Sequence, residues 1–119
     1  MSNATAAPII PATAAKGFHG WKAEQYIPLD GNRVLRVYTL KSSSGKLVTM
    51  ATAGAVSHDA GFACFSFLMG GDFSERILAT DTRATEKAIN AQHAAALAPE
   101  AIGPVLARCA AHYAPKAEG

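Results

Sequence analysis

The sequence has few of the features that would assign it a chemistry. Its 119 residues include two cysteines and one tryptophan, charged residues make up 17%, and the formal net charge is only +2. This charge is too small to impose nucleic-acid binding by itself. The chain also has no run of about 18 apolar residues, so we expect no transmembrane helix and no membrane partner.

The length and the hydrophobic content of the chain predict one small domain. Hydrophobic residues make up 50% of the chain, and a domain of this size can bury a core without a metal or a disulfide framework. We expect a flexible N-terminal tail over residues 1–16, a single domain over residues 17–115 and a flexible C-terminal end over residues 116–119. The first residues lack the basic start and the apolar stretch of a secretory signal, so the cytoplasm is the expected compartment.

The first half of the domain has the pattern of an antiparallel sheet. Strand-forming residues over Trp21–Leu29 and Arg33–Lys41, separated by a short polar turn, predict a hairpin. A second polar turn leads into a strand over Lys46–Val56. The segment Ser57–Gly61 contains turn-forming residues, and we expect it to end that strand before another one over Phe62–Met69.

The strand over Phe62–Met69 is apolar on both faces. Such a strand must be covered on both sides, so we expect it in the middle of the sheet, or else covered on its second face by a partner subunit. The next segment, Phe73–Thr80, has no clean period. It fits either a fifth strand or an irregular connection.

Two helices are expected after the strands. Asp81 or Thr82 can cap the first, which would run to about Leu97 with an inner face made mostly of alanine. The second fits Pro104–Tyr113, or a start one turn earlier at Pro99, with a stripe of apolar residues at helical spacing: Ile102, Val105, Leu106, Cys109 and Tyr113. The predicted fold class is therefore α+β, an antiparallel four- or five-stranded meander sheet followed by two C-terminal helices packed on one face. We expect Cys64 and Cys109 to be buried free thiols.

No residue pattern indicates catalysis or a cofactor. The four histidines are isolated in sequence and have no second ligand at a metal-binding spacing, so no metal site is predicted. His58 beside Asp59 is the best candidate for an acid or a base, but adjacent residues in a turn seldom point at each other. We therefore expect no enzyme.

Basic and aromatic residues are concentrated near the N-terminus. Between Lys16 and Lys46, six lysines and arginines stand against two acidic residues, and the rest of the chain is acidic. Cations interleaved with aromatic rings on a sheet are typical of single-stranded nucleic-acid binding, where phosphates pair with Lys or Arg and bases stack on rings. The residues that would do this are Trp21, Lys22, Tyr26, Arg33, Arg36, Tyr38, Lys41 and Lys46.

Two functions thus follow as hypotheses. The first is a small intracellular, non-catalytic binding module that acts through protein–protein contacts, with a homodimer as one form of partner. It depends on the apolar strand over Phe62–Met69, which a short chain has difficulty covering alone. The alternative is a single-stranded nucleic-acid-binding protein that uses the basic and aromatic segment 16–46.

Overall fold

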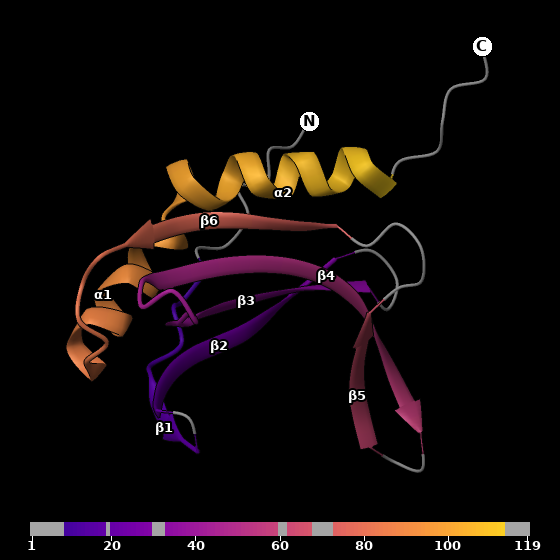
Figure 1. The fold of residues 1–119 in the computed structure, drawn as a ribbon. Helices are drawn as coiled ribbons and strands as arrows, with labels where there is room; N and C mark the ends of the chain where they lie inside the picture. The colour runs from indigo at the N-terminus through magenta and orange to yellow at the C-terminus, as the bar shows by residue number, and fades with distance from the viewer. Residues whose placement is uncertain (1–8, 19, 30–32, 60–61, 68–72, 114–119) are drawn as a thin grey trace.

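The computed structural model describes residues 9–18, 20–29, 33–59, 62–67 and 73–113, with the backbone alone for residues 55–59 and 62–67. Its elements are, in chain order, β1 (Ala15–Gly17), β2 (Gly20–Pro28), β3 (Arg33–Lys41), β4 (Leu47–Asp59), β5 (Phe62–Phe67), β6 (Ser74–Thr80), α1 (Glu86–Ala96) and α2 (Pro99–Tyr113). All strand pairs are antiparallel. The predicted α+β class, a sheet followed by two C-terminal helices, is confirmed (Figure 1).

The strand order is β1–β2–β3–β4–β5, with β6 paired to β4. The predicted hairpin of β2 and β3 is present, with Glu24 opposite Tyr38, and the amide of Leu29 donates to the carbonyl of Arg33 at the point where it turns. The turn between β3 and β4 contains Gly45 at a φ of 93°, a conformation that favours glycine because it has no Cβ. The local turn signals therefore correctly predicted both reversals.

Strand β4 is longer than the sequence pattern predicted. It continues through residues 57–59, where a turn was expected, and these residues pair with β5. Its first part, Leu47–Thr52, pairs with β6 instead. The uncertain segment after residue 73 is thus a strand, and it occupies the position beside β4.

The position predicted for the Phe62–Met69 strand is wrong, because β5 lies at the end of the strand order rather than in the middle. Pairing between β3 and β4 ends at Ala55, so beyond that residue β4 has only β5 beside it among the described strands. Figure 1 shows this β4–β5 hairpin projecting away from α2 and the rest of the sheet. Residues 68 and 69 lie outside the described residues.

The first helix begins later than expected. Its N-cap is Thr85, whose side chain accepts a hydrogen bond from the amide of Ala88, and Asp81 and Thr82 precede the helix. The second helix begins at Pro99, the earlier of the two predicted starts. No single described helix has both the length and the apolarity of a membrane span; α1 and α2 reach them only as a pair, which is bent by 60°.

Both helices cover the same face of the sheet. Ile102, Val105 and Cys109 of α2 are buried in a cluster with Leu35 and other small apolar residues of β3 and β4. A second cluster joins Ile89 of α1 to Ala23 and Leu47. Because the paired residues of β2, β3 and β4 in these clusters lie on one side of the pleat, neither described helix lies on the opposite side.

The inner face of α1 is more polar than predicted. Gln92 and His93 are buried there beside Ile89 and Ala96. His93 Nδ1 lies 2.8 Å from the hydroxyl of Thr39, which lies 2.7 Å from the hydroxyl of Thr49. Gln92 donates to the carbonyl of Leu47 and to the Thr49 hydroxyl, which satisfies its amide group. A hydrogen-bonded network therefore takes the place of the expected alanines.

The end of the expected N-terminal tail is attached to the domain. The amide of Ala12 donates to Gln25, and the amide of Ala14 donates to Asn90 of α1. Ala14 is buried, and Ala15 and Lys16 belong to β1. These contacts order residues 12–16 against the sheet and α1. Residues 1–8 and 116–119 lie outside the described residues.

Candidate functional site

The sheet face opposite the two helices has no described helix packed on it. We call it the open face and define it by residues that alternate with the core residues of the same strands. The charged and large side chains among them are Lys22, Glu24 and Tyr26 of β2, Val34, Arg36, Tyr38 and Leu40 of β3, Val48 and Met50 of β4, and Arg76 of β6.

An apolar row crosses the middle of the open face. Tyr38 lies opposite Met50, and Leu40 lies opposite Val48, so these side chains form adjacent cross-strand pairs. Together with Val34 they are half-buried although neither described helix packs on them. A partner could remove their remaining apolar area from water.

Glu24 organises the charges on this face. Its carboxylate accepts a hydrogen bond from Arg36 Nε and lies 3.3 Å from Lys22 Nζ. Partial burial opposes ionisation of Glu24, but the two cations outweigh it and hold the pKa of this carboxyl below its usual value. Partial burial and the Glu24 charge raise the pKa of Tyr26. The Arg36 guanidinium also lies 4.1 Å from the centroid of the Tyr38 ring, which holds both side chains flat on the sheet.

The structure brings together four of the eight residues of the nucleic-acid hypothesis. Lys22, Tyr26, Arg36 and Tyr38 share the open face. Trp21 lies on the helix side, partly buried against the second core cluster. Arg33 also lies on that side, where its guanidinium stacks 3.9 Å from the Tyr113 ring centroid.

The last two residues of that set lie near the turn between β3 and β4. Lys46 is 3.8 Å from Asp81 in an exposed ion pair, and Lys41 is exposed at the end of β3. Of the cations brought together on the open face from this set, Lys22 and Arg36 share one carboxylate. The basic segment therefore does not form one continuous basic surface.

The candidate acid–base pair does not lie in a turn. Residues 58 and 59 are the last two of β4 and pair with residues 63 and 62 of β5. Their side chains, and that of Cys64, lie outside the described part. Cys109 is a buried free thiol as expected, and burial raises its pKa. Within the described residues, no group of three or more His, Cys, Asp or Glu side chains could hold a metal ion.

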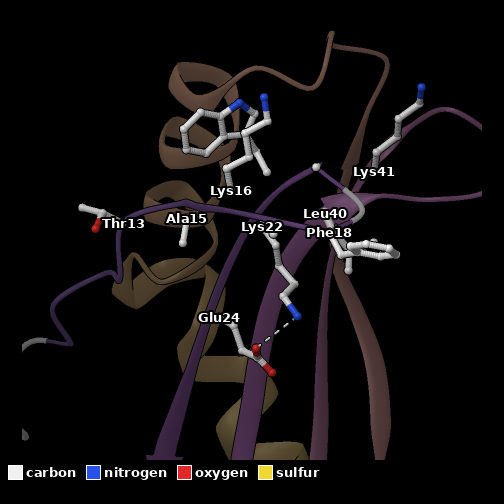
Figure 2. A pocket seen from close by; sticks show the side chains of 11 residues that line it. Thr13, Ala15, Lys16, Phe18, Lys22, Glu24, Leu40 and Lys41 are labelled. Atoms are coloured by element: carbon white, nitrogen blue, oxygen red, sulfur yellow. Dashed lines mark ion pairs between the residues drawn. The ribbon is translucent and has the colours of Figure 1, made fainter.

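A pocket of about 600 Å³ lies at the β1–β2 edge of the sheet. It is lined by Thr13, Ala15, Lys16, Gly17, Phe18, Gly20, Trp21, Lys22, Glu24, Leu40 and Lys41. Figure 2 shows Lys16 and Lys41 extending to one side of the β1–β2 ribbon, and Lys22 and Glu24 to the other. The pocket thus wraps around the sheet edge, and on one side it continues into the open face.

Comparison with protein-family models, with curated proteins and with solved structures finds no match to this chain. The candidate site therefore depends on the geometry alone.

Sequence reasoning missed most of the apolar row on the open face. Val34 and Leu40 were assigned only as strand formers, and Met50 was not singled out. The signal that could have found them is the alternation in β3, where Leu35, Val37 and Thr39 alternate with these half-buried residues. A strand with apolar side chains on both faces and helices on only one leaves apolar surface without a cover.

Proposed function

We propose that this chain is a non-catalytic binding module that holds a protein partner on its open face. The observation that carries the proposal is the half-buried apolar row of β3 and β4 on a sheet face that no described helix covers. Apolar surface of this kind, rimmed by polar residues, marks sites of protein–protein contact. A central apolar strip with a charged rim is also the usual anatomy of such interfaces.

The charges on the rim indicate the chemistry of the partner. Lys22, Arg36 and Arg76 are positive and Glu24 is negative, so the defined open face has a net charge of +2. Opposite charges across an interface accelerate association and suppress wrong partners. The partner that fits is a protein segment with apolar residues that enter the row and acidic residues that face the rim.

A selection experiment tests this proposal with a defined probe. A random peptide library is panned against the folded protein, and the enriched peptides are synthesised and titrated into the isotope-labelled chain. We expect enriched peptides that combine apolar with acidic residues, and amide shift changes concentrated on the open-face residues of β2, β3 and β4. A library that yields no retained peptide, or shift changes on the helix side, would contradict the proposal.

Two matched variants sharpen the test. Met50→Glu places a negative charge in the apolar row, and Ala107→Glu places the same charge on an exposed position of α2. We expect Met50→Glu to weaken peptide binding by about tenfold or more, as substitution of a central interface residue does, and Ala107→Glu to leave it unchanged. Circular dichroism of both variants establishes that the fold is intact. Equal binding by the two variants would place the contact elsewhere.

Single-stranded nucleic acid is the second candidate for the same face. It is favoured by the juxtaposition of Tyr26, which is 46% exposed, with Tyr38, Lys22 and Arg36. It is weakened by the shared Glu24, which already pairs with both cations. Fluorescence anisotropy with a labelled oligothymidylate at low and at physiological salt separates the two functions: steeply salt-dependent binding lost in Arg36→Gln would favour nucleic acid.

A further inference from the structure

The pocket at the β1–β2 edge has features that protein binding on the open face does not explain. Its volume of about 600 Å³ lies in the range of small-molecule sites. Its residues come from β1, β2 and the end of β3, and several belong to neither the apolar row nor the rim of the open face. The pocket is therefore considered as a candidate site for a second ligand.

Two of the lysines that line this pocket have no acidic partner of their own. Lys22 and Lys46 each have a carboxylate within 4.0 Å, but in the part of the chain that the structure describes Lys16 and Lys41 have none. Both are exposed, both line the pocket, and both extend to the same side of the β1–β2 ribbon (Figure 2). Two positive charges that line one pocket repel each other, and an anion bound there would be attracted to both of them.

Aromatic surface accompanies these cations. Trp21 is the register partner of Lys16 across β1 and β2, and the Lys16 ammonium lies 6.0 Å from the centroid of its ring. Trp21 is only partly buried, so part of its ring remains exposed to water. A large apolar side chain gains free energy when a flat apolar ligand covers its exposed surface. A ligand with a ring on this aromatic surface and a negative group near the lysines would interact with both parts of the pocket.

We propose that the β1–β2 pocket binds a small organic anion in which a flat ring is joined to a phosphate, as in a nucleoside monophosphate. The ring lies against the exposed part of the Trp21 indole, and the phosphate accepts hydrogen bonds from Lys16 and Lys41. Lysine ammonium groups bind phosphate as point charges, and base–aromatic stacking tolerates any base. The pocket shares Lys22, Glu24 and Leu40 with the open face, but Trp21, Lys16 and Lys41, which carry this proposal, do not belong to that face.

The single tryptophan makes the proposal directly measurable, because Trp21 is the only source of tryptophan fluorescence in the chain. Adenosine monophosphate is titrated into the protein with excitation at the red edge of the tryptophan band, and calorimetry supplies a second readout that does not depend on the indole. We expect a saturable fluorescence change with a matching binding isotherm. Adenosine, which lacks the anion, and inorganic phosphate, which lacks the ring, are expected to bind more weakly than the nucleotide.

Lysine-to-glutamine variants test whether the pocket lysines take part in binding. Replacing Lys16 and Lys41 together by Gln is expected to weaken nucleotide binding by about tenfold, a low figure for two charge-assisted hydrogen bonds because both groups are exposed. Lys87→Gln, at an exposed position of α1 outside the pocket, is expected to bind as the unmodified chain does. Equal affinity in the double variant and in Lys87→Gln, or equal affinity for adenosine and its monophosphate, would overturn the proposal. So would the absence of a saturable change in both readouts.

Discussion

The buried histidine of α1 predicts how the stability of the fold depends on pH. His93 is fully buried, and both of its ring nitrogens are occupied: Nε2 lies 2.6 Å from Gln25 Oε1 and Nδ1 lies 2.8 Å from the Thr39 hydroxyl. Gln25 Oε1 is an acceptor that also receives the amide of Ala12, so Nε2 must be the donor. The neutral ring then accepts the Thr39 hydroxyl proton at Nδ1, and protonation would break this arrangement.

Burial lowers the pKa of His93 below its ordinary value of 6.5. At a pH above that value the folded and unfolded chains both hold a neutral ring, and the group adds no pH dependence. As the pH falls below 6.5, His93 becomes protonated in the unfolded chain but stays neutral in the folded chain. The free energy of unfolding therefore falls. The free energy of unfolding decreases by up to about 1.4 kcal/mol per pH unit until the pH reaches the lowered pKa of His93 in the folded chain. Between about pH 7 and about pH 5 it amounts to at most about 2 kcal/mol.

Urea denaturation of the unmodified chain and of His93→Gln across this pH range measures the effect. Glutamine cannot titrate, so the difference between the two free energies of unfolding isolates the histidine and cancels contributions from the other titratable groups. We expect the unmodified chain to lose stability more steeply towards acid than the variant does. Parallel curves for the two proteins would refute the reasoning, because they would show that His93 titrates equally in the folded and unfolded chains.

Two further predictions concern the helices. Thr85→Ala removes the side chain that accepts the Ala88 amide and should lower the free energy of unfolding by about 1 kcal/mol in urea; an unchanged midpoint would mean that Thr85 does not cap α1. Cys109 is 1% exposed and burial raises the pKa of its thiol, so its modification by a thiol reagent, followed by mass spectrometry of its peptide, should become fast only when urea unfolds the chain. Fast modification without urea would show that the α2 core opens locally.

Local patterns predicted the elements well where neighbours in the sequence decide the structure. The β2–β3 hairpin and the Gly45 turn follow from alternation and turn chemistry, both of which act over a few residues. The stripe of α2 predicted the buried side of that helix through Ile102, Val105 and Cys109. The start of α1 was missed because Asp81, Thr82 and Thr85 can all cap a helix, and the local sequence does not show which of them does so.

Competition between distant segments could not be predicted in this way. Phe62–Phe67 has the composition of a central strand, but β6 occupies the edge of β4 along Leu47–Thr52, and nothing local to either segment shows which one pairs there. The burial of Gln92 and His93 could not be predicted for the same reason, since their partners Leu47 and Thr39 lie on strands more than forty residues away in sequence. The basic segment was overestimated as a surface because a count of charges ignores strand alternation, which places Arg33 and Arg36 on opposite faces.

The same alternation bears on whether the open face pairs with a second copy of itself. Two copies that meet face to face would bring together two surfaces of net charge +2, and like-charge contacts across an interface cost several kcal/mol. Salt screens such contacts over about 8 Å at physiological ionic strength, so repulsion is weakened but not removed. A stable complex also needs about 800 Å² covered on each partner, more than the apolar row alone can supply. The charged rim must therefore take part in any stable complex, and an acidic partner can use it where a second copy of this face cannot.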